Sequence, residues 1–107
     1  MTSFDERKDK YEKKFAHDAE LKFKAEARRN KLLGQWAAEL LGISGAGIDA
    51  YVQSLIRADL AERGDEDVFR KLRADFDKAG VAQTDHQIRR HMDEFLVKAA
   101  EELQAKG

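Results

Sequence analysis

Residues 32–42 of the chain, LLGQWAAELLG, decide the fold class. Leucine, tryptophan and alanine recur there at spacings of three and four, which is the periodicity of a helix that buries one face. The same spacing extends back through Ala25 to Leu21, and Gly42 follows as a candidate C-cap. We therefore predict one long helix whose apolar face contributes to a core.

Three more helices are expected downstream. Apolar residues recur at helical spacing in residues 48–60, 68–79 and 88–103. Gly64 and Gly80 follow the first two of these segments, and Asp65 is a candidate N-cap between them. Thr84 and Gln87 form a capping box before the last segment.

The connector at residues 42–47 shares its glycine content with phosphate-binding loops. However, no strand pattern precedes it, and no Lys-Ser or Lys-Thr pair follows it. We interpret it as a helix cap and a connector.

No segment shows the strict alternation of a half-buried strand, and short connections favour neighbouring antiparallel helices. The predicted fold class is all-α, a small four-helix bundle with a mobile N-terminal helical arm. We assign the arm to residues 1–18 and the four-helix globular domain to residues 19–107. The large side chains expected in the core are Trp36, Leu55, Phe69, Phe76 and Phe95.

The N-terminal arm has helical signals but little apolar surface. Phe4, Tyr11 and Phe15 lie on one helical stripe. Ser3 and Glu6 have the spacing of a capping box. Burying the three aromatic side chains contributes roughly 2 kcal/mol each, whereas ordering the backbone costs about 1–2 kcal/mol per residue. We therefore expect the arm to be mobile in isolation and to become ordered on a partner.

The boundary between the arm and the globular domain carries no glycine, proline or clear cap. The stripe of Phe15 instead continues through Ala19 to Phe23. The arm is therefore also consistent with a frayed extension of the first core helix.

The composition limits the class of protein. The chain has 107 residues, of which 42% are hydrophobic and 38% charged, so one small domain plus an arm is expected. The absence of cysteine excludes disulfides and thiolate zinc sites. Apolar runs are far shorter than a membrane span, and the N-terminus is charged where a signal peptide is apolar. We expect a cytoplasmic protein without direct membrane insertion.

The charge distribution suggests a second class, a nucleic-acid-associated small helical protein. Residues 1–31 hold ten Lys or Arg against seven Asp or Glu. The basic cluster consists of Lys22, Lys24, Arg28, Arg29 and Lys31. Because acids interrupt it, unlike the one-sided patch of most nucleic-acid binders, we interpret it as a solvated helix face and expect no nucleic-acid partner.

Signals for catalysis or metal binding are missing. His86 and His91 are five residues apart and do not share a helical face as zinc ligands do. Neither Ser44 nor Ser54 has the context of an activated nucleophile. We expect no enzyme activity, no catalytic residue and no metal site.

Two acidic residues lie beside apolar rows. Asp59 and Asp75 are expected to be paired structurally, with Arg57 or Arg73 as neighbouring partners.

Five segments resemble one known family: SFDER at 3–7, YEKKFAHD at 11–18, LKFK at 21–24, ARRNKLLG at 27–34 and WAA at 36–38. The chain resembles the zeta subunit of alphaproteobacterial F-type ATP synthases, an inhibitor of ATP hydrolysis by the catalytic head. The resemblance implies a four-helix globular part and a short N-terminal inhibitory segment. In that family the segment is mobile in the free protein and inserts as a helix at a catalytic alpha/beta subunit interface near the rotor.

The resemblance also implies partners and contact residues. The partners are the catalytic alpha and beta subunits and the rotor subunit, which place the protein at the cytoplasmic face of the inner membrane. The segment blocks the cycling of one catalytic interface and favours arrest of hydrolysis over arrest of synthesis. Weak nucleotide binding has been considered for the family, but no nucleotide motif is present here and no cofactor is expected. The implied contact residues are Phe4, Arg7, Lys8, Tyr11, Glu12, Lys13, Lys14 and Phe15.

His17, at the end of the arm, suggests a pH switch, because an imidazole with a pKa of about 6.5 changes charge between pH 6 and pH 8. On this hypothesis His17→Ala flattens the pH dependence of inhibition, measured by ATPase titrations across that range. An unchanged strength and pH profile would remove His17 from the mechanism.

Overall fold

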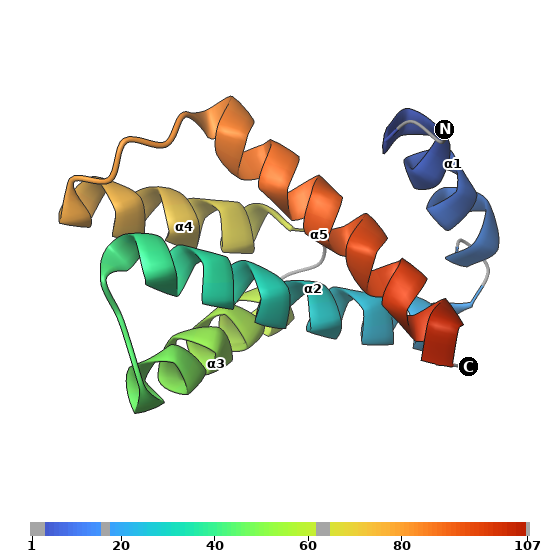
Figure 1. Ribbon diagram of the computed structural model, residues 1–107, viewed down its shortest axis with the longest axis horizontal. Helices are drawn as coiled ribbons and strands as arrows, with labels where there is room; N and C mark the ends of the chain where they lie inside the picture. The colour runs from blue at the N-terminus through green and yellow to red at the C-terminus, as the bar shows by residue number, and fades with distance from the viewer. Residues whose placement is uncertain (1–3, 16–17, 62–64, 107) are drawn as a thin grey trace.

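The computed structural model describes residues 4–15, 18–61 and 65–106, which form helices and, in these ranges, no strand. The elements are α1 (Phe4–Phe15), α2 (Ala19–Leu41), α3 (Ala46–Ala61), α4 (Glu66–Ala79) and α5 (Asp85–Lys106). The all-α class is confirmed, with four helices after residue 18 and a fifth within the arm. Figure 1 shows α3 and α4 at one end of the molecule, and α1 beside the C-terminal half of α5 at the other.

The main core lies between α2, α3, α4 and α5 and contains no residue of α1. Its buried side chains are Leu33, Ala37, Leu55, Val68, Leu72, Phe76, Ile88 and Met92. Leu55 and Phe76 are fully buried, as the sequence predicted. These residues come from four helices, and none of them belongs to the arm.

Trp36, Phe69 and Phe95 lie shallower than predicted. They are half-buried and pack against the main core rather than inside it. The ring of Trp36 stacks on His91 with centroids 4.1 Å apart and meets Phe76 edge-on at 5.5 Å. Trp36 therefore closes the core at its border, a position that suits a large ring with a polar N–H group.

Most of the predicted helix ends are confirmed. Gly42 and Gly80 adopt left-handed conformations, with φ of 77° and 71°, and their N–H groups bond to carbonyls of the preceding turn. The backbone N–H of Gln87 donates to Thr84 Oγ1 at 3.1 Å, and the N–H of Thr84 donates to Gln87 Oε1 at 2.9 Å. The glycine-rich connector leads directly into α3, as expected of a cap and connector.

Asp65 precedes α4 as predicted, but its side chain makes no capping hydrogen bond. Its carboxylate lies 3.9 Å from the Arg29 guanidinium instead. The predictions that concern Ser3, His17 and Gly64 lie outside the described residues.

The boundary between α1 and α2 differs from the sequence interpretation. Asp18 is a true N-cap, because its Oδ1 accepts a hydrogen bond from the N–H of Leu21 at 3.1 Å. Asp18 followed by Glu20 in the first turn is a helix start signal. The sequence interpretation overlooked it because the aromatic stripe continues from Phe15 to Phe23. The arm helix is therefore not an extension of α2.

Gly34 is where α3 approaches the backbone of α2. A Cβ atom at Gly34 would lie 2.8 Å from Val52 Cγ2 and 3.1 Å from Val52 Cα. The second of these atoms belongs to the backbone and cannot move aside cheaply. A side chain at Gly34 would therefore push the two helices apart.

We expect Gly34→Ala to destabilise the protein by about 1–3 kcal/mol through overpacking, although alanine favours a helix by about 1 kcal/mol over glycine. The midpoint of urea unfolding measures this change. Gln35→Ala, on the exposed face of the same helix, is the matched control. Equal midpoints for the two variants would show that the helices do not need this close approach.

Candidate functional site

Helix α1 docks on α2 and α5 through a second apolar cluster. Phe15 is 2% exposed and lies with Ala25 of α2 and Ala100 of α5. The ring of Tyr11 stacks on Phe15 with centroids 5.0 Å apart. Residues that border the cluster are Tyr11, Leu21, Leu96 and Leu103.

The packing of Phe15 against the globular helices was not predicted from the sequence. Two alanines leave a recess that fits its ring, because a methyl side chain keeps the neighbouring backbones accessible. Ala25 and Ala100 lie far apart in sequence, so helical periodicity cannot show that they meet. The position of Phe15 on the aromatic stripe of α1 was the one local signal for burial.

Two ion pairs join the exposed side of α1 to α5. Arg7 Nε and Nη2 donate to the two carboxylate oxygens of Glu101 at 2.9 and 2.6 Å. The Arg7 guanidinium lowers the pKa of Glu101 by hydrogen bonding. Lys8 Nζ lies 3.4 Å from Asp93 Oδ2. Exposed pairs of this kind contribute about 0.2–1 kcal/mol each, which is less than the roughly 2 kcal/mol of one buried aromatic ring.

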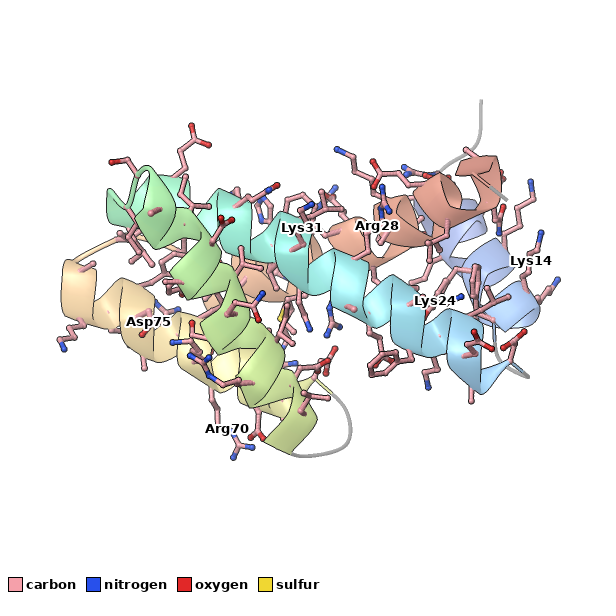
Figure 2. All side chains as sticks on the ribbon, turned by 90° about the horizontal axis from the view of Figure 1, so that it is seen from below. Lys14, Lys24, Arg28, Lys31, Arg70 and Asp75 are labelled. Carbon is pink, nitrogen blue, oxygen red and sulfur yellow. The ribbon has the colours of Figure 1, made fainter. Side chains whose placement is uncertain are left out.

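The remaining predicted contact residues do not gather on the body of the protein. Phe4 is half-buried at the rim of a cleft of about 440 Å³ between α1 and the start of α5. Glu12, Lys13 and Lys14 are exposed. Figure 2 shows Lys14 on α1 at one end of the molecule, far from Asp75 and Arg70.

A buried polar cluster lies between α2 and α3. Arg29, which is 3% exposed, donates from Nη2 to Asp59 Oδ1 at 3.3 Å and from Nε to Asn30 Oδ1 at 3.1 Å. The amide of Asn30 donates to the other Asp59 oxygen at 3.1 Å. The prediction of a structural role for Asp59 is confirmed, but its partner is Arg29 and not the predicted Arg57. The partner comes from the facing helix instead of the same one.

Asp75 also has partners that differ from the prediction. It accepts a hydrogen bond from Tyr51 Oη at 2.7 Å and from Lys71 Nζ at 3.0 Å. The pKa of Tyr51 is raised mainly by burial of its hydroxyl group and, to a lesser extent, by its hydrogen bond to Asp75. Arg73 instead bonds to Asp77 and Asp85 and to the carbonyl of Gln83. Asp75 therefore links α3 to α4, and Arg73 holds the connector between α4 and α5.

A cleft of about 240 Å³ borders the buried polar cluster. Its lining residues are Tyr11, Lys22, Glu26, Arg29, Asp59, Asp65 and Leu96. Burial raises the pKa of Glu26, and it also raises the pKa of Tyr11, which α1 contributes. Three carboxylates line the cleft, and the Arg29 guanidinium is engaged by Asp59. Lys22 and Arg29 are the basic residues of this lining, so its carboxylates outnumber its cations, which does not favour the phosphates of a nucleotide.

The basic cluster does not form a one-sided patch. Arg29 is buried, Arg28 pairs with Glu102 at 2.9 Å, and Lys24 pairs with Glu20 at 3.2 Å. Figure 2 shows Lys24, Arg28 and Lys31 spaced along α2. This arrangement does not favour the nucleic-acid alternative.

The two described histidines lie in different environments. His86 is exposed, and His91 lies at the edge of the core with Nδ1 2.8 Å from the carbonyl oxygen of Gln87. In residues 4–15, 18–61 and 65–106, His, Asp and Glu form no group that could hold a metal ion. None of the helices in these ranges is long and apolar enough to cross a membrane.

The chain matches the model of a known protein family and is similar to a solved structure. The model of the ATPase inhibitor subunit zeta family matches residues 1–102. A protein whose structure was solved by solution NMR is 39% identical, with a TM-score of 0.71, over 81% of this chain and 99% of that one. No curated protein matches the chain.

The raised pKa of Glu26 predicts a pH-dependent stability effect. An acid whose folded-state pKa exceeds its unfolded value destabilises the fold above the folded pKa, and this penalty disappears below the unfolded value of about 4.3. We expect Glu26→Gln to raise the free energy of unfolding at pH 7 by at most about 1 kcal/mol, and to lose this advantage near pH 4. Urea melts at the two pH values measure it.

Glu39→Gln on the exposed face of α2 is the control and should change little at either pH. A Glu26→Gln variant that is less stable than the parent at pH 7 would show that its ionised carboxylate stabilises the cluster.

Proposed function

Because the chain belongs to the ATPase inhibitor subunit zeta family, we propose that it inhibits ATP hydrolysis by the catalytic head of an F-type ATP synthase through its N-terminal arm. The family is one of inhibitor subunits rather than enzymes, and it implies interaction with the F-type ATP synthase.

The observation that carries the assignment is the way α1 is attached. α1 is a helix separate from α2, and its ring contacts lie outside the main core. Its described contacts with the body include one buried ring, a bordering tyrosine and two exposed ion pairs. An effector segment that has to leave one surface for another needs this kind of weak attachment.

In the proposed mechanism the arm inserts as a helix at a catalytic alpha/beta subunit interface near the rotor and stops the cycling of that interface. The aromatic side chains act as anchors, and the charged ones set the register of the helix. The anchors are Phe4, Tyr11 and Phe15. The charged residues are Arg7, Lys8, Glu12, Lys13 and Lys14. Binding to the synthase would hold the protein at the cytoplasmic face of the inner membrane.

The globular domain serves in this proposal as the stable base of the arm. Its main core comes from α2, α3, α4 and α5, and it is independent of the residues that enter the synthase. Binding and folding are thus assigned to different parts of the chain.

We expect removal of residues 1–18 to abolish inhibition and to leave a cooperatively folded helical domain. The loss of the fully buried Phe15 ring should cost about 2 kcal/mol of stability, and the loss of the Asp18 N-cap of α2 about 1 kcal/mol more. An ATPase titration of purified catalytic head, run beside thermal melts of both proteins, measures the two effects. Phe4→Ala and Tyr11→Ala should each weaken inhibition in the full-length chain.

Two outcomes would contradict this assignment. Equal inhibition by the truncated protein would place the effector on the globular domain. Unfolding of the truncated protein would show that the fold requires α1.

A further inference from the structure

We propose that the globular domain carries a second contact surface for the synthase, centred on Phe23 of α2 and Leu60 of α3. This surface binds an acidic region of the catalytic head next to the interface that the arm enters. We call these two residues, with the cations Lys24, Lys31 and Arg57 beside them, the α2–α3 patch. The inference rests on the proposed function of the arm. It does not depend on where the arm lies in the free protein.

Phe23 and Leu60 are the most exposed large apolar side chains in the described part of the chain. Phe23 is 60% exposed and Leu60 66%, compared with 39% for Leu40, the third of this kind. A single exposed apolar side chain is ordinary, whereas apolar side chains grouped within a polar rim are typical of a protein contact. The position of the two residues in the fold therefore decides what they can bind.

Helix α3 runs antiparallel to α2. A Cβ atom at Gly34 would lie 2.8 Å from Val52 Cγ2, and Asn30 Nδ2 donates to Asp59 Oδ2 at 3.1 Å. Moving forward along α3 from Val52 to Asp59 thus moves back along α2 from Gly34 to Asn30. Since α3 ends two residues after Asp59, the N-terminal part of α2 extends past that end. Figure 2 shows this part of α2, labelled at Lys24, beyond the end of α3.

Phe23 and Leu60 both border this end of α3. Phe23 lies seven residues before Asn30, so it is two helical turns, about 10 Å, away along the same side of α2. Asn30 faces α3 through its bond to Asp59, and Leu60 follows Asp59 in the last turn of α3. The two exposed apolar side chains therefore lie at the same end of the contact between α2 and α3, although they are far apart in sequence.

Cations lie beside both apolar residues. Lys24 and Lys31 are exposed and share one stripe of α2, directly beside the stripe of Phe23. Arg57 is exposed and lies one turn before Leu60 on α3. Figure 2 shows Lys24 and Lys31 spaced along α2 on either side of the point where α3 ends.

The described acidic side chains near the patch are engaged within the protein. Asp59 and Asp65 contact the guanidinium of the buried polar cluster. Glu26 lines the cleft beside that cluster, and Glu20 pairs with Lys24 at 3.2 Å. The charge that the patch presents outward is therefore positive, and it complements an acidic partner while it repels a basic one.

Phe23 lies close to the synthase whenever the arm is inserted. The chain from Phe15 to Ala19 spans at most about 14 Å when fully extended, and the helical turn from Ala19 to Phe23 adds about 6 Å. Entry of the arm therefore brings the patch to the surface of the head around that interface. A second contact made through so short a connection acts at a high effective concentration and strengthens binding of the whole protein.

The first test places a negative charge on the patch in the full-length protein. We expect Phe23→Glu and Leu60→Glu each to raise the concentration for half-maximal inhibition of purified catalytic head at least about fivefold. Leu40→Glu introduces the same charge at the third exposed apolar site, at the other end of α2, and should leave this concentration unchanged. Thermal melts of the three variants should stay close to that of the parent, because the replaced side chains are exposed.

Photo-crosslinking identifies what the patch contacts. On irradiation, p-benzoylphenylalanine in place of Phe23 should crosslink to a subunit of the catalytic head, and the same group in place of Leu40 should not. Mass spectrometry should map the crosslink to a segment in which Asp and Glu outnumber Lys and Arg. A crosslink to a basic segment would contradict the charge complementarity on which the proposal depends.

Anionic vesicles test a different occupant, because basic residues around apolar side chains also suit a negatively charged membrane surface. The measurement is co-sedimentation with vesicles of phosphatidylcholine and phosphatidylglycerol. If the parent sediments with the vesicles and Phe23→Glu does not, while both inhibit the head equally, the patch is a membrane contact and the proposal is overturned.

The α2–α3 patch is also overturned if neither Phe23→Glu nor Leu60→Glu inhibits less well than Leu40→Glu. In that case a parent protein that loses inhibition on removal of residues 1–18 still supports the proposed function. If the parent and the protein without residues 1–18 inhibit equally, both proposals fail.

Discussion

Helix α2 contacts all four other helices, and small residues lie where α3 and α1 approach it. Gly34 admits the backbone of α3, and Ala25 helps form the recess for α1 beside α5. Close-packed interiors tolerate little extra volume, so each small residue determines how near one neighbour can come. The position of α1 therefore depends on the same property of α2 that brings the core helices together.

The Arg29 guanidinium adds a directional constraint to this packing. A buried charge is costly unless it is paired and hydrogen-bonded, and Asp59 and Asn30 meet both needs from α3 and α2. Apolar contacts between two helices allow several registers, whereas this pair is satisfied in one. The cluster also borders the cleft to which Tyr11 contributes, so the region that fixes α3 on α2 is adjacent to the attachment of α1.

The sequence predicted the features that depend on near neighbours and missed those that depend on distant ones. Gly42, Gly80 and the Thr84–Gln87 pair act within one helical turn, so their roles were visible. Asp59 has an arginine two residues away but binds one on another helix, and no local pattern distinguishes the two partners.

The depth of Trp36 and the recess for Phe15 depend on how helices from distant parts of the chain meet, which periodicity does not specify. The contact residues of the proposed arm lie in a segment whose partner surface is not part of this chain. Their roles came from family resemblance, and the structure adds where each lies in the docked state.

The ion pairs of α1 and its buried ring respond differently to the salt concentration. Salt screens exposed charges over a Debye length of about 8 Å at physiological ionic strength, while it leaves the burial of Phe15 almost unaffected. Higher salt should therefore loosen the Arg7 and Lys8 contacts without emptying the recess. The charges that contact α5 are also those proposed to set the register of the arm in the synthase, so salt acts on the electrostatic contacts of the arm in both places and hardly at all on its buried ring.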